Sequence, residues 1–268
     1  MDLSIIIVSY NARADLERCL AALTSAPPSV SHEIVVIDNQ STDGSAQAAK
    51  AQRGIRVIEA DSNLGFARAN NVGIRETSGA NLLLLNSDTV VPPGAIDRLV
   101  AELARRTDVA VIAPRLVDST GRAELSFGRM MGPWNELRQK ILVGAQARGI
   151  GLAIRFVERA TRREQSPDWV SGACLMVRRS DAEAVGLLDE RYFMYAEDVD
   201  FCASIRARGR KILFWPLAEV VHVRGRSAAA RPGPTRQAYR RSQMAFYQKH
   251  HPAWAPLLRL YIRLGGQR

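Results

Sequence analysis

Carboxylate side chains stand at three places in this 268-residue sequence where a polar segment begins. Asp38 directly follows an apolar run, and Asp88 follows four consecutive leucines after a two-residue polar step. Glu197, Asp198 and Asp200 place three carboxylates within four residues, beside aromatic side chains. Such groups can accept hydrogen bonds from a base or ribose, hold a divalent cation, or remove a proton from a hydroxyl group. The residue types therefore indicate a site for a polar ligand, with acid–base chemistry.

Each of these positions also has a structural interpretation. Asp38 could belong to a loop in which Asp43 caps the next helix, and Asp88 could cap the helix that starts near Pro92. The acidic cluster could mark a helix start, where the helix dipole favours negative charge. His222, which lies among valines, is by itself more typical of a buried structural histidine than of a ligand. Position alone leaves both interpretations open.

The polar residues follow short apolar runs that alternate with segments of helical periodicity. This alternation predicts an α/β protein with an open, mainly parallel, twisted sheet flanked by helices. Sheets of this kind bind ligands beyond the carboxyl ends of their strands, where the polar residues are expected. The strands are expected at 3–9, 33–37, 55–59, 82–85, 109–113 and 211–215, with two of the helices at 66–77 and 92–106.

The formal net charge of +10 comes from two basic segments. Residues 220–268 contain ten basic and no acidic residues, whereas residues 1–219 contain 27 of each kind. Within that neutral part, residues 122–163 carry nine basic and three acidic side chains. A mildly acidic core with two basic segments differs from a uniformly basic nucleic-acid-binding protein, so we expect no nucleic-acid partner.

The basic tail has the composition of a helix that lies on a membrane surface. Between Tyr239 and Tyr261 its Arg and Lys residues alternate with aromatic and leucine side chains. Residues 133–163 could add a second contact. The alternative is a tail that packs on the rest of the protein with its arginines in solvent. We favour an anionic membrane surface as partner, and expect a cytoplasmic protein bound peripherally at the inner face of the cell membrane.

Other features narrow the function classes. No apolar run approaches the roughly 18 residues that span a bilayer. Cys19, Cys174 and Cys202 are odd in number and unpatterned, as is typical of reduced thiols in the cytosol. Gly149 and Gly151 lack a third glycine and a preceding strand, and neither a Walker A lysine motif nor a His-Glu-x-x-His motif occurs. The sequence argues against a hydride-transfer enzyme and a P-loop kinase.

In combination, these residues resemble the inverting family 2 glycosyltransferases, which have the GT-A fold. The resemblance implies a catalytic domain at 1–227. Charge and helical periodicity predict a basic helical insert at 122–163 within it and a basic amphipathic helical tail at 228–268. Seven segments occur in the family's order over roughly residues 3–227, and the one at 63–73 looks most like the bacterial rhamnosyltransferase branch. They are Ile-Val-Ser-Tyr-Asn (7–11), Val-Ile-Asp-Asn-Gln-Ser-Thr-Asp-Gly (36–44), Asn-Leu-Gly-Phe-Ala-Arg-Ala-Asn-Asn-Val-Gly (63–73), Leu-Leu-Asn-Ser-Asp (84–88), Ser-Gly-Ala-Cys (171–174), Tyr-Ala-Glu-Asp-Val-Asp (195–200) and His-Val-Arg-Gly-Arg-Ser (222–227).

The resemblance implies a nucleotide pocket at the first strand ends. Asp38 would contact the nucleotide base, and Ser9 and Asn11 would line the same pocket. The donor would be a dTDP- or UDP-linked sugar. The other substrate contacts would be Asn63, Gly65 and Phe66 against the nucleotide, Arg68 near the diphosphate, Ser87 on the turn that follows the leucines, and Gly172 and Ala173 beside the donor sugar.

The same resemblance implies the groups that carry the reaction. Asp198 would be the base that deprotonates the acceptor hydroxyl, with Glu197 and Asp200 positioning the acceptor or the helix. Asp88 and His222 would hold a divalent cation, Mg²⁺ or Mn²⁺, which offsets charge on the departing diphosphate.

One position departs from the family pattern. Asn86 stands where the family's Asp-x-Asp motif has its first aspartate. A neutral amide is a weaker ligand for a hard cation than a carboxylate, so this departure lowers the expected metal affinity.

The resemblance implies transfer of rhamnose from dTDP-rhamnose to a lipid-linked or polysaccharide acceptor in cell-wall or surface glycan synthesis. A UDP-sugar-dependent enzyme of the same fold is the alternative. A sugar-phosphate nucleotidyltransferase is disfavoured, because residues 3–15 offer only Arg13 and no glycine to bind a triphosphate. A non-catalytic polyanion-binding protein would leave the three carboxylate clusters unexplained.

Overall fold

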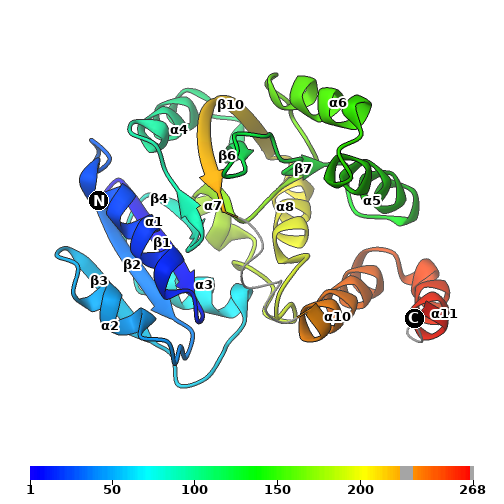
Figure 1. Ribbon diagram of the computed structural model, residues 1–268, viewed down its shortest axis with the longest axis horizontal. Helices are drawn as coiled ribbons and strands as arrows, with labels where there is room; N and C mark the ends of the chain where they lie inside the picture. The colour runs from blue at the N-terminus through cyan, green and yellow to red at the C-terminus, as the bar shows by residue number, and fades with distance from the viewer. Residues whose placement is uncertain (224–231, 266–268) are drawn as a thin grey trace.

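The computed structural model describes residues 1–223 and 232–265 of the 268-residue chain. An eight-stranded sheet, in the order β3-β2-β1-β4-β9-β6-β10-β5, has helices on both faces (Figure 1). Strands β7 and β8 form a separate two-stranded sheet. The strands are β1 (Leu3–Ser9), β2 (His32–Asp38), β3 (Ile55–Glu59), β4 (Asn81–Asn86), β5 (Thr89–Val90), β6 (Val109–Val117), β7 (Phe127–Gly128), β8 (Trp169–Val170), β9 (Cys174–Arg178) and β10 (Lys211–His222).

The sheet is mainly parallel, which confirms the predicted fold class. β1 pairs in parallel with both β2 and β4, β2 pairs in parallel with β3, and β6 pairs in parallel with β10. β9 runs antiparallel to β4 and β6, and the two-residue β5 runs antiparallel to β10. The alternation of strands and helices in the sequence does not predict this inverted central strand.

Buried side chains alternate between the two faces of the sheet. In β1, Ile5 and Ile7 belong to the core on one face, and Ile6 belongs to the core on the other. The four leucines of β4 alternate in the same way. Helices α1 and α4 contribute to the first core, and α3 and α8 contribute to the second. Strands that are buried on both faces carry continuous apolar runs, which explains why the sequence shows no polar alternation there.

The two helices whose bounds the sequence predicts lie close to them. The helix expected at 66–77 ends at Arg75, and the helix expected at 92–106 begins at Ala95, because the two prolines lie in the turn before it. The helices are α1 (Arg13–Ser25), α2 (Ser45–Lys50), α3 (Phe66–Arg75), α4 (Ala95–Arg105), α5 (Pro133–Ala147), α6 (Gly151–Thr161), α7 (Arg179–Ala184), α8 (Glu197–Ala207), α10 (Pro232–His250) and α11 (Ala255–Gly265), with the 3₁₀ helix η1 at Pro252–Trp254.

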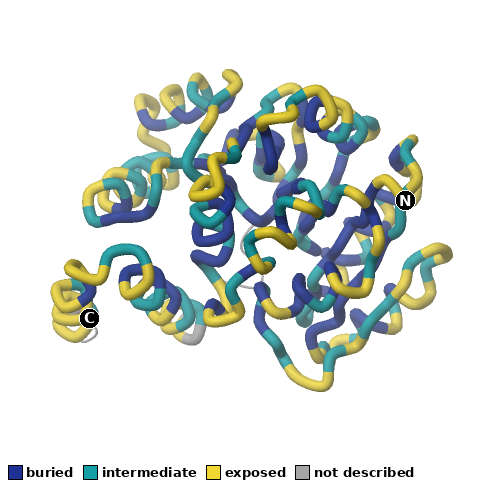
Figure 2. The backbone as a smooth tube through the Cα atoms, turned by 180° about the vertical axis from the view of Figure 1, so that it is seen from behind, coloured by how far each residue is buried: buried dark blue, intermediate teal, exposed yellow. Residues whose placement is uncertain are grey.

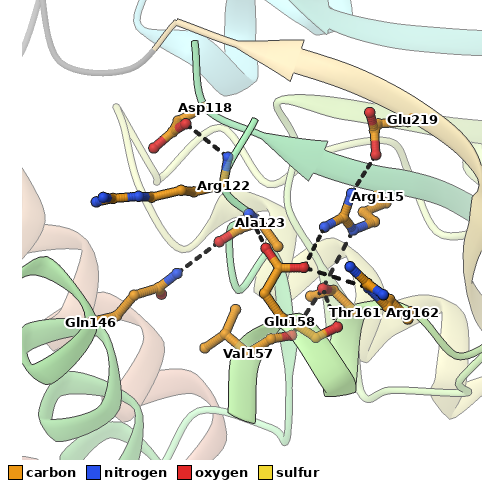
Figure 3. A network of polar contacts seen from close by, with 10 residues as sticks. All are labelled: Arg115, Asp118, Arg122, Ala123, Gln146, Val157, Glu158, Thr161, Arg162 and Glu219. Atoms are coloured by element: carbon orange, nitrogen blue, oxygen red, sulfur yellow. Dashed lines mark hydrogen bonds and ion pairs between the residues drawn. The ribbon is translucent and has the colours of Figure 1, made fainter. Parts of the chain in front are cut away.

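The basic segment 122–163 contains α5 and α6, and a polar network fixes them to the sheet (Figure 3). Glu158 of α6 accepts hydrogen bonds from the backbone N–H of Ala123 (3.0 Å) and from Arg115 of β6 (2.8 Å). Gln146 of α5 donates to the carbonyl oxygen of Ala123 (2.7 Å). Both helices therefore bind the backbone of Ala123, at the start of the basic segment.

The C-terminal helices pack on the domain along one side. Phe246 and Tyr247 of α10 are buried against Tyr192 and Val199. This contact is the packing that the sequence left as an alternative for the tail, whereas α11 is exposed over most of its length (Figure 2). None of the described helices is long and apolar enough to cross a membrane. Residues 224–227 of the last predicted motif, and the expected boundary after them, lie outside the described residues.

Candidate functional site

The parallel register brings the predicted polar residues to one edge of the sheet. Ser9, the last residue of β1, pairs with Asp38, the last residue of β2. On the other side of β1, Val8 pairs with Asn86, the last residue of β4. Because β1 lies between β2 and β4, the ends of all three strands meet where the sequence predicts a ligand site.

Asp38 and Ser9 lie next to each other at the paired ends of β2 and β1, where the sequence predicts nucleotide contacts. Asp38 is buried, and its Oδ2 atom accepts a hydrogen bond from the backbone N–H of Ser41 (2.9 Å). Within the described residues, neither Asp38 Oδ1 nor Ser9 Oγ, both buried, has a hydrogen-bond partner. A buried polar atom without a partner costs about 1–3 kcal/mol, so two neighbouring ones fit a place where a ligand supplies the missing hydrogen bonds.

Asn11 closes the loop beside this pocket. Its Oδ1 atom accepts hydrogen bonds from the backbone N–H (2.8 Å) and the hydroxyl group (3.3 Å) of Thr42. Its own backbone N–H donates to Ser41 Oγ (2.9 Å). Asn11 therefore fastens the loop that follows β2 against the end of β1, and so shapes the place where the sequence predicts nucleotide contacts.

The segment at 63–66 is clamped from two sides. The Nδ2 atom of Asn39 donates to Asn63 Oδ1 (2.9 Å) and to the carbonyl oxygen of Gly65 (3.2 Å). The backbone N–H of Phe66 donates to the carbonyl oxygen of Phe193 (2.7 Å). A Cβ atom on Gly65 would lie 2.3 Å from that same oxygen, so only glycine fits. Sequence reasoning missed Asn39, although its place directly after Asp38 in a polar loop was a usable signal.

Asp198 lies at the start of α8 and contacts the turn before β9. Its Oδ2 atom accepts a hydrogen bond from the backbone N–H of Gly172 (2.9 Å), and its Oδ1 atom accepts one from that of Val199 (2.8 Å). A Cβ atom on Gly172 would lie 3.3 Å from the ring of Phe66 and 3.5 Å from Asp198 Cβ. The structure thus brings together three segments, around Phe66, Gly172 and Asp198, that are far apart in the sequence.

Glu197 and Asp198, adjacent in α8, both have a raised proton affinity. Burial and the neighbouring charge of Asp198 raise the pKa of Glu197 well above its ordinary value. Burial also raises the pKa of Asp198, against the opposing effect of the hydrogen bonds from Gly172 and Val199. A carboxylate with raised proton affinity is suited to take a proton from a hydroxyl group.

Asp88, two residues after β4, and His222, the last residue of β10, form a second cluster. His222 Nε2 lies 3.3 Å from Asp88 Oδ1, and His222 Nδ1 lies 3.1 Å from Glu124 Oε2. Burial alone would lower the pKa of His222, but its contacts with the two carboxylates outweigh that effect and raise the pKa to about 9. Sequence reasoning missed Glu124, one of three acids in an otherwise basic segment.

The donor atoms of this second cluster fit a divalent cation. Carboxylate oxygen and imidazole nitrogen are both suitable ligands, and two ligands of one Mg²⁺ or Mn²⁺ ion lie about 3 Å apart, close to the observed separation. Among the described residues, no group of three or more His, Cys, Asp or Glu side chains could hold a metal ion. In the predicted arrangement, Asp88 and His222 would supply two ligands, and substrate and water would complete the set.

Other predicted site residues have varied surroundings. Arg68 is mostly exposed and lies 3.9 Å from Glu190, and Asp200 is buried against the C-terminal tail. Ser87 is buried in the turn after β4, and the carbonyl oxygen of Ala173 accepts the backbone N–H of Asn86 (2.9 Å). The substrate contacts expected of these residues stay predictions.

Comparison with known proteins gives sequence relatives over nearly the whole chain. A model of glycosyl transferase family 2 matches residues 4–185. An N-acetylglucosaminyl-diphospho-decaprenol L-rhamnosyltransferase of Mycobacterium tuberculosis is 33% identical, over 95% of this chain and 87% of that protein. The low-salt glycan biosynthesis hexosyltransferase Agl10 of Haloferax volcanii is 28% identical, over 82% of this chain and 67% of that protein.

Solved structures share the fold at low sequence identity. The mannosyltransferase PcManGT of Pyrobaculum calidifontis, in complex with GDP-Man and Mn²⁺, has a TM-score of 0.67 at 18% identity and covers 96% of this chain and 68% of its own. GalNAc-T7 with UDP, GalNAc and Mn²⁺ has a TM-score of 0.61 at 18% identity, over 84% of this chain and 44% of its own. At this identity the likeness establishes a shared fold.

Proposed function

The chain belongs to glycosyl transferase family 2 and is a nucleotide-sugar-dependent glycosyltransferase with the predicted GT-A fold, and we propose that it transfers rhamnose from dTDP-rhamnose to a lipid-linked acceptor. The rhamnosyltransferase of Mycobacterium tuberculosis, whose name specifies a diphospho-decaprenol acceptor, supports this choice because the similarity extends over 95% of the chain. We also propose that the enzyme works in cell-wall or surface glycan synthesis, at the cytoplasmic face of the membrane.

Asp198 is the base of the proposed reaction. It accepts the proton of the acceptor hydroxyl while that oxygen attacks the anomeric carbon, and the bond from that carbon to the diphosphate breaks on the opposite face. The configuration at the anomeric carbon inverts, and no covalent intermediate on the protein is needed. The backbone N–H of Gly172 donates to Asp198 Oδ2, and the same glycine lies close to the Phe66 ring.

The other groups bind and orient the donor. Asp38 Oδ1 and Ser9 Oγ are buried without partners in the described part of the chain, and they accept or donate the hydrogen bonds of the nucleotide base or ribose. Asn63, Gly65 and Phe66, held by Asn39, pack against the nucleotide. A divalent cation held by Asp88 and His222 would offset the negative charge that develops on the departing diphosphate.

The contact of Asp198 with Gly172, beside Phe66 and the strand ends, carries this proposal. A donor-by-acceptor assay with dTDP-rhamnose and UDP-sugars, against polyprenyl-diphosphate-linked GlcNAc, tests it. Turnover with dTDP-rhamnose that Asp198→Asn abolishes, with nucleotide-sugar binding retained, supports both the substrate and the base. Turnover with UDP-sugars alone would show that the donor is a UDP-sugar and not dTDP-rhamnose. Full activity of Asp198→Asn would show that Asp198 is not the base.

The metal is tested in the same assay. EDTA should stop turnover, and Mg²⁺ or Mn²⁺ should restore it. Turnover that is indifferent to the chelator would contradict a cation at Asp88 and His222.

A further inference from the structure

Exposed apolar side chains of the insert form a stripe that no described part of the protein covers. On α5, Trp134, Leu137 and Ile141 recur at helical spacing, and all three are at least half exposed. On α6, Leu152 and Phe156 are one turn apart and are 74% and 57% exposed. The polar network of Figure 3 fixes α6 to the sheet, so the exposed apolar side chains of α6 are held in a defined position.

A second stripe runs along the tail. Leu257, Leu260, Tyr261 and Leu264 of α11 stand at positions i, i+3, i+4 and i+7, and each is more than half exposed. Trp254 of η1, three residues before the first of them, is 44% exposed. Figure 2 shows this terminal helix as exposed along most of its length.

The two stripes carry positive charge and no exposed acid. The two acidic side chains of residues 133–163 point inward: Glu136 is buried and accepts a hydrogen bond from Gln243 (2.6 Å), and Glu158 binds Arg115. Helix α11 has no acidic residue. The exposed basic side chains include Arg138, Arg148, Arg155, Arg159, Arg259 and Arg263.

Insert and tail meet at their apolar ends. His251 Nε2 lies 2.8 Å from the carbonyl oxygen of Met131. Trp134 begins the α5 stripe three residues after Met131, and Trp254 begins the tail stripe three residues after His251. Figure 1 shows α5, α6 and α11 at the same end of the molecule, opposite to α2 and β3. We call the exposed apolar and basic side chains of 134–163 and 254–264 the basic-apolar face.

We propose that the basic-apolar face docks the enzyme on an anionic lipid bilayer, with its apolar side chains in the interface and its arginines against the headgroups. The proposal deepens the proposed function, because a lipid-linked acceptor requires the enzyme at a bilayer. Apolar and aromatic stripes flanked by basic residues have the composition of interfacial helices. A second copy of the chain fits less well, because a symmetric contact would bring together two faces that both carry only positive charge.

Vesicle sedimentation of the full-length protein tests this face. We expect binding to vesicles that contain phosphatidylglycerol, weaker binding to phosphatidylcholine alone, and loss of the difference at high salt. Arg155→Gln with Arg159→Gln should lower the partition coefficient by about 25-fold, since each basic residue near an anionic leaflet contributes about fivefold. Leu257→Ser with Leu264→Ser should lower it several-fold on both kinds of vesicle.

Matched controls use exposed side chains outside the face. Arg53→Gln with Arg98→Gln removes the same charge at the turn after α2 and on α4, and Leu217→Ser removes an exposed leucine in the middle of β10. These variants should partition like the unaltered protein.

Three outcomes would overturn the proposal. The first is equal binding to both kinds of vesicle that does not depend on salt. The second is a loss of vesicle binding in the control variants equal to that in the face variants. The third is a concentration-dependent dimer in light scattering without vesicle binding. Because neither donor nor acceptor is present, failure here is distinguishable from failure of the proposed reaction.

Discussion

The Nζ atom of Lys249 lies 2.8 Å from Oδ2 of Asp200, and this ion pair joins the C-terminal helix α10 to helix α8. Asp200 is 1% exposed, and its Oδ1 atom also lies 2.6 Å from His250 Nε2 and 3.2 Å from the hydroxyl group of Tyr192. Asp200 is one half-turn beyond Asp198 in the same helix. The tail therefore supports the element that carries the proposed base.

Replacement of Lys249 by Met should destabilise the protein, because it leaves a buried carboxylate with fewer compensating charges. We expect the free energy of unfolding to fall by about 2 kcal/mol, less than for a fully buried pair, since Lys249 keeps 29% of its side chain exposed and His250 remains in place. Urea denaturation measures the change.

Lys50→Met is the matched control. Lys50 pairs with Glu59, and both side chains are about half exposed, so this variant should change the free energy of unfolding by less than about 0.5 kcal/mol. Equal losses in the two variants would show that the pairing with Asp200 contributes no more than a surface ion pair.

The first half of the sheet could be predicted because its strands are short apolar runs buried on both faces. Parallel strands end at one edge, so the positions of Ser9, Asp38 and Asp88 followed from the order of elements in the sequence. The inverted strand β9 could not be predicted. The apolar segment that contains it is interrupted at Gly172, and nothing in its residues shows that the strand after this glycine runs antiparallel to β4. Direction is decided by pairing with β4, which local sequence does not encode.

The contacts that complete the site depend on residues far apart in the sequence. Glu124 reaches His222 across 98 positions, and Lys249 reaches Asp200 across 49. Periodicity and motif spacing give no information about such pairs, since the intervening chain decides which side chains meet. The tail, which its composition predicts to lie on a membrane, divides into a packed helix, α10, and an exposed one, α11.

The pH profile of kcat/KM should report the ionisation of Asp198. Burial raises the pKa of this carboxyl from 3.8, and the base must be deprotonated to act. Activity should therefore fall with decreasing pH, with a midpoint above the value of an ordinary aspartate. An acid limb at or below that ordinary value would show that another group is the base.

Glu197→Gln should make the protein more stable near neutral pH. Since the pKa of Glu197 is raised well above 4.5 in the folded state, the folded protein binds this proton more tightly than the unfolded chain. The free energy of unfolding then falls as the pH rises from 4.5 through the folded pKa, because over this range the unfolded chain releases the proton while the folded protein still holds it. The glutamine variant removes this decline, and thermal unfolding between pH 4 and pH 8 measures it. An unchanged decline in the variant would exclude Glu197 as its source.

Gly65→Ala should destabilise the protein more than Gly54→Ala. Both glycines have positive φ, 78° and 80°, but a Cβ atom on Gly65 would meet the Phe193 carbonyl oxygen at 2.3 Å, whereas one on Gly54 would meet nothing within 4 Å. Positive φ costs about 1 kcal/mol or more in either variant, and at Gly65 the extended ψ of −178° and the collision should raise the cost to about 3 kcal/mol. Thermal unfolding compares the two. Equal losses would mean that the contact with Phe193 relaxes without cost.

Glu124→Gln should weaken cation binding through His222, because the carboxylate faces Nδ1 while the opposite ring nitrogen faces Asp88. An acid at Nδ1 orients an imidazole ligand and increases its basicity, and loss of such a partner lowers metal affinity by about 10-fold to 100-fold. Titration of Mn²⁺ into the protein with dTDP, followed by calorimetry, measures this directly and without turnover. Glu164→Gln, an acid that pairs with Arg106, is the control and should bind Mn²⁺ as the unaltered protein does. If both variants keep the original affinity, Glu124 does not position His222 for a cation, and its contact with the ring serves only to balance the charge of a buried histidine.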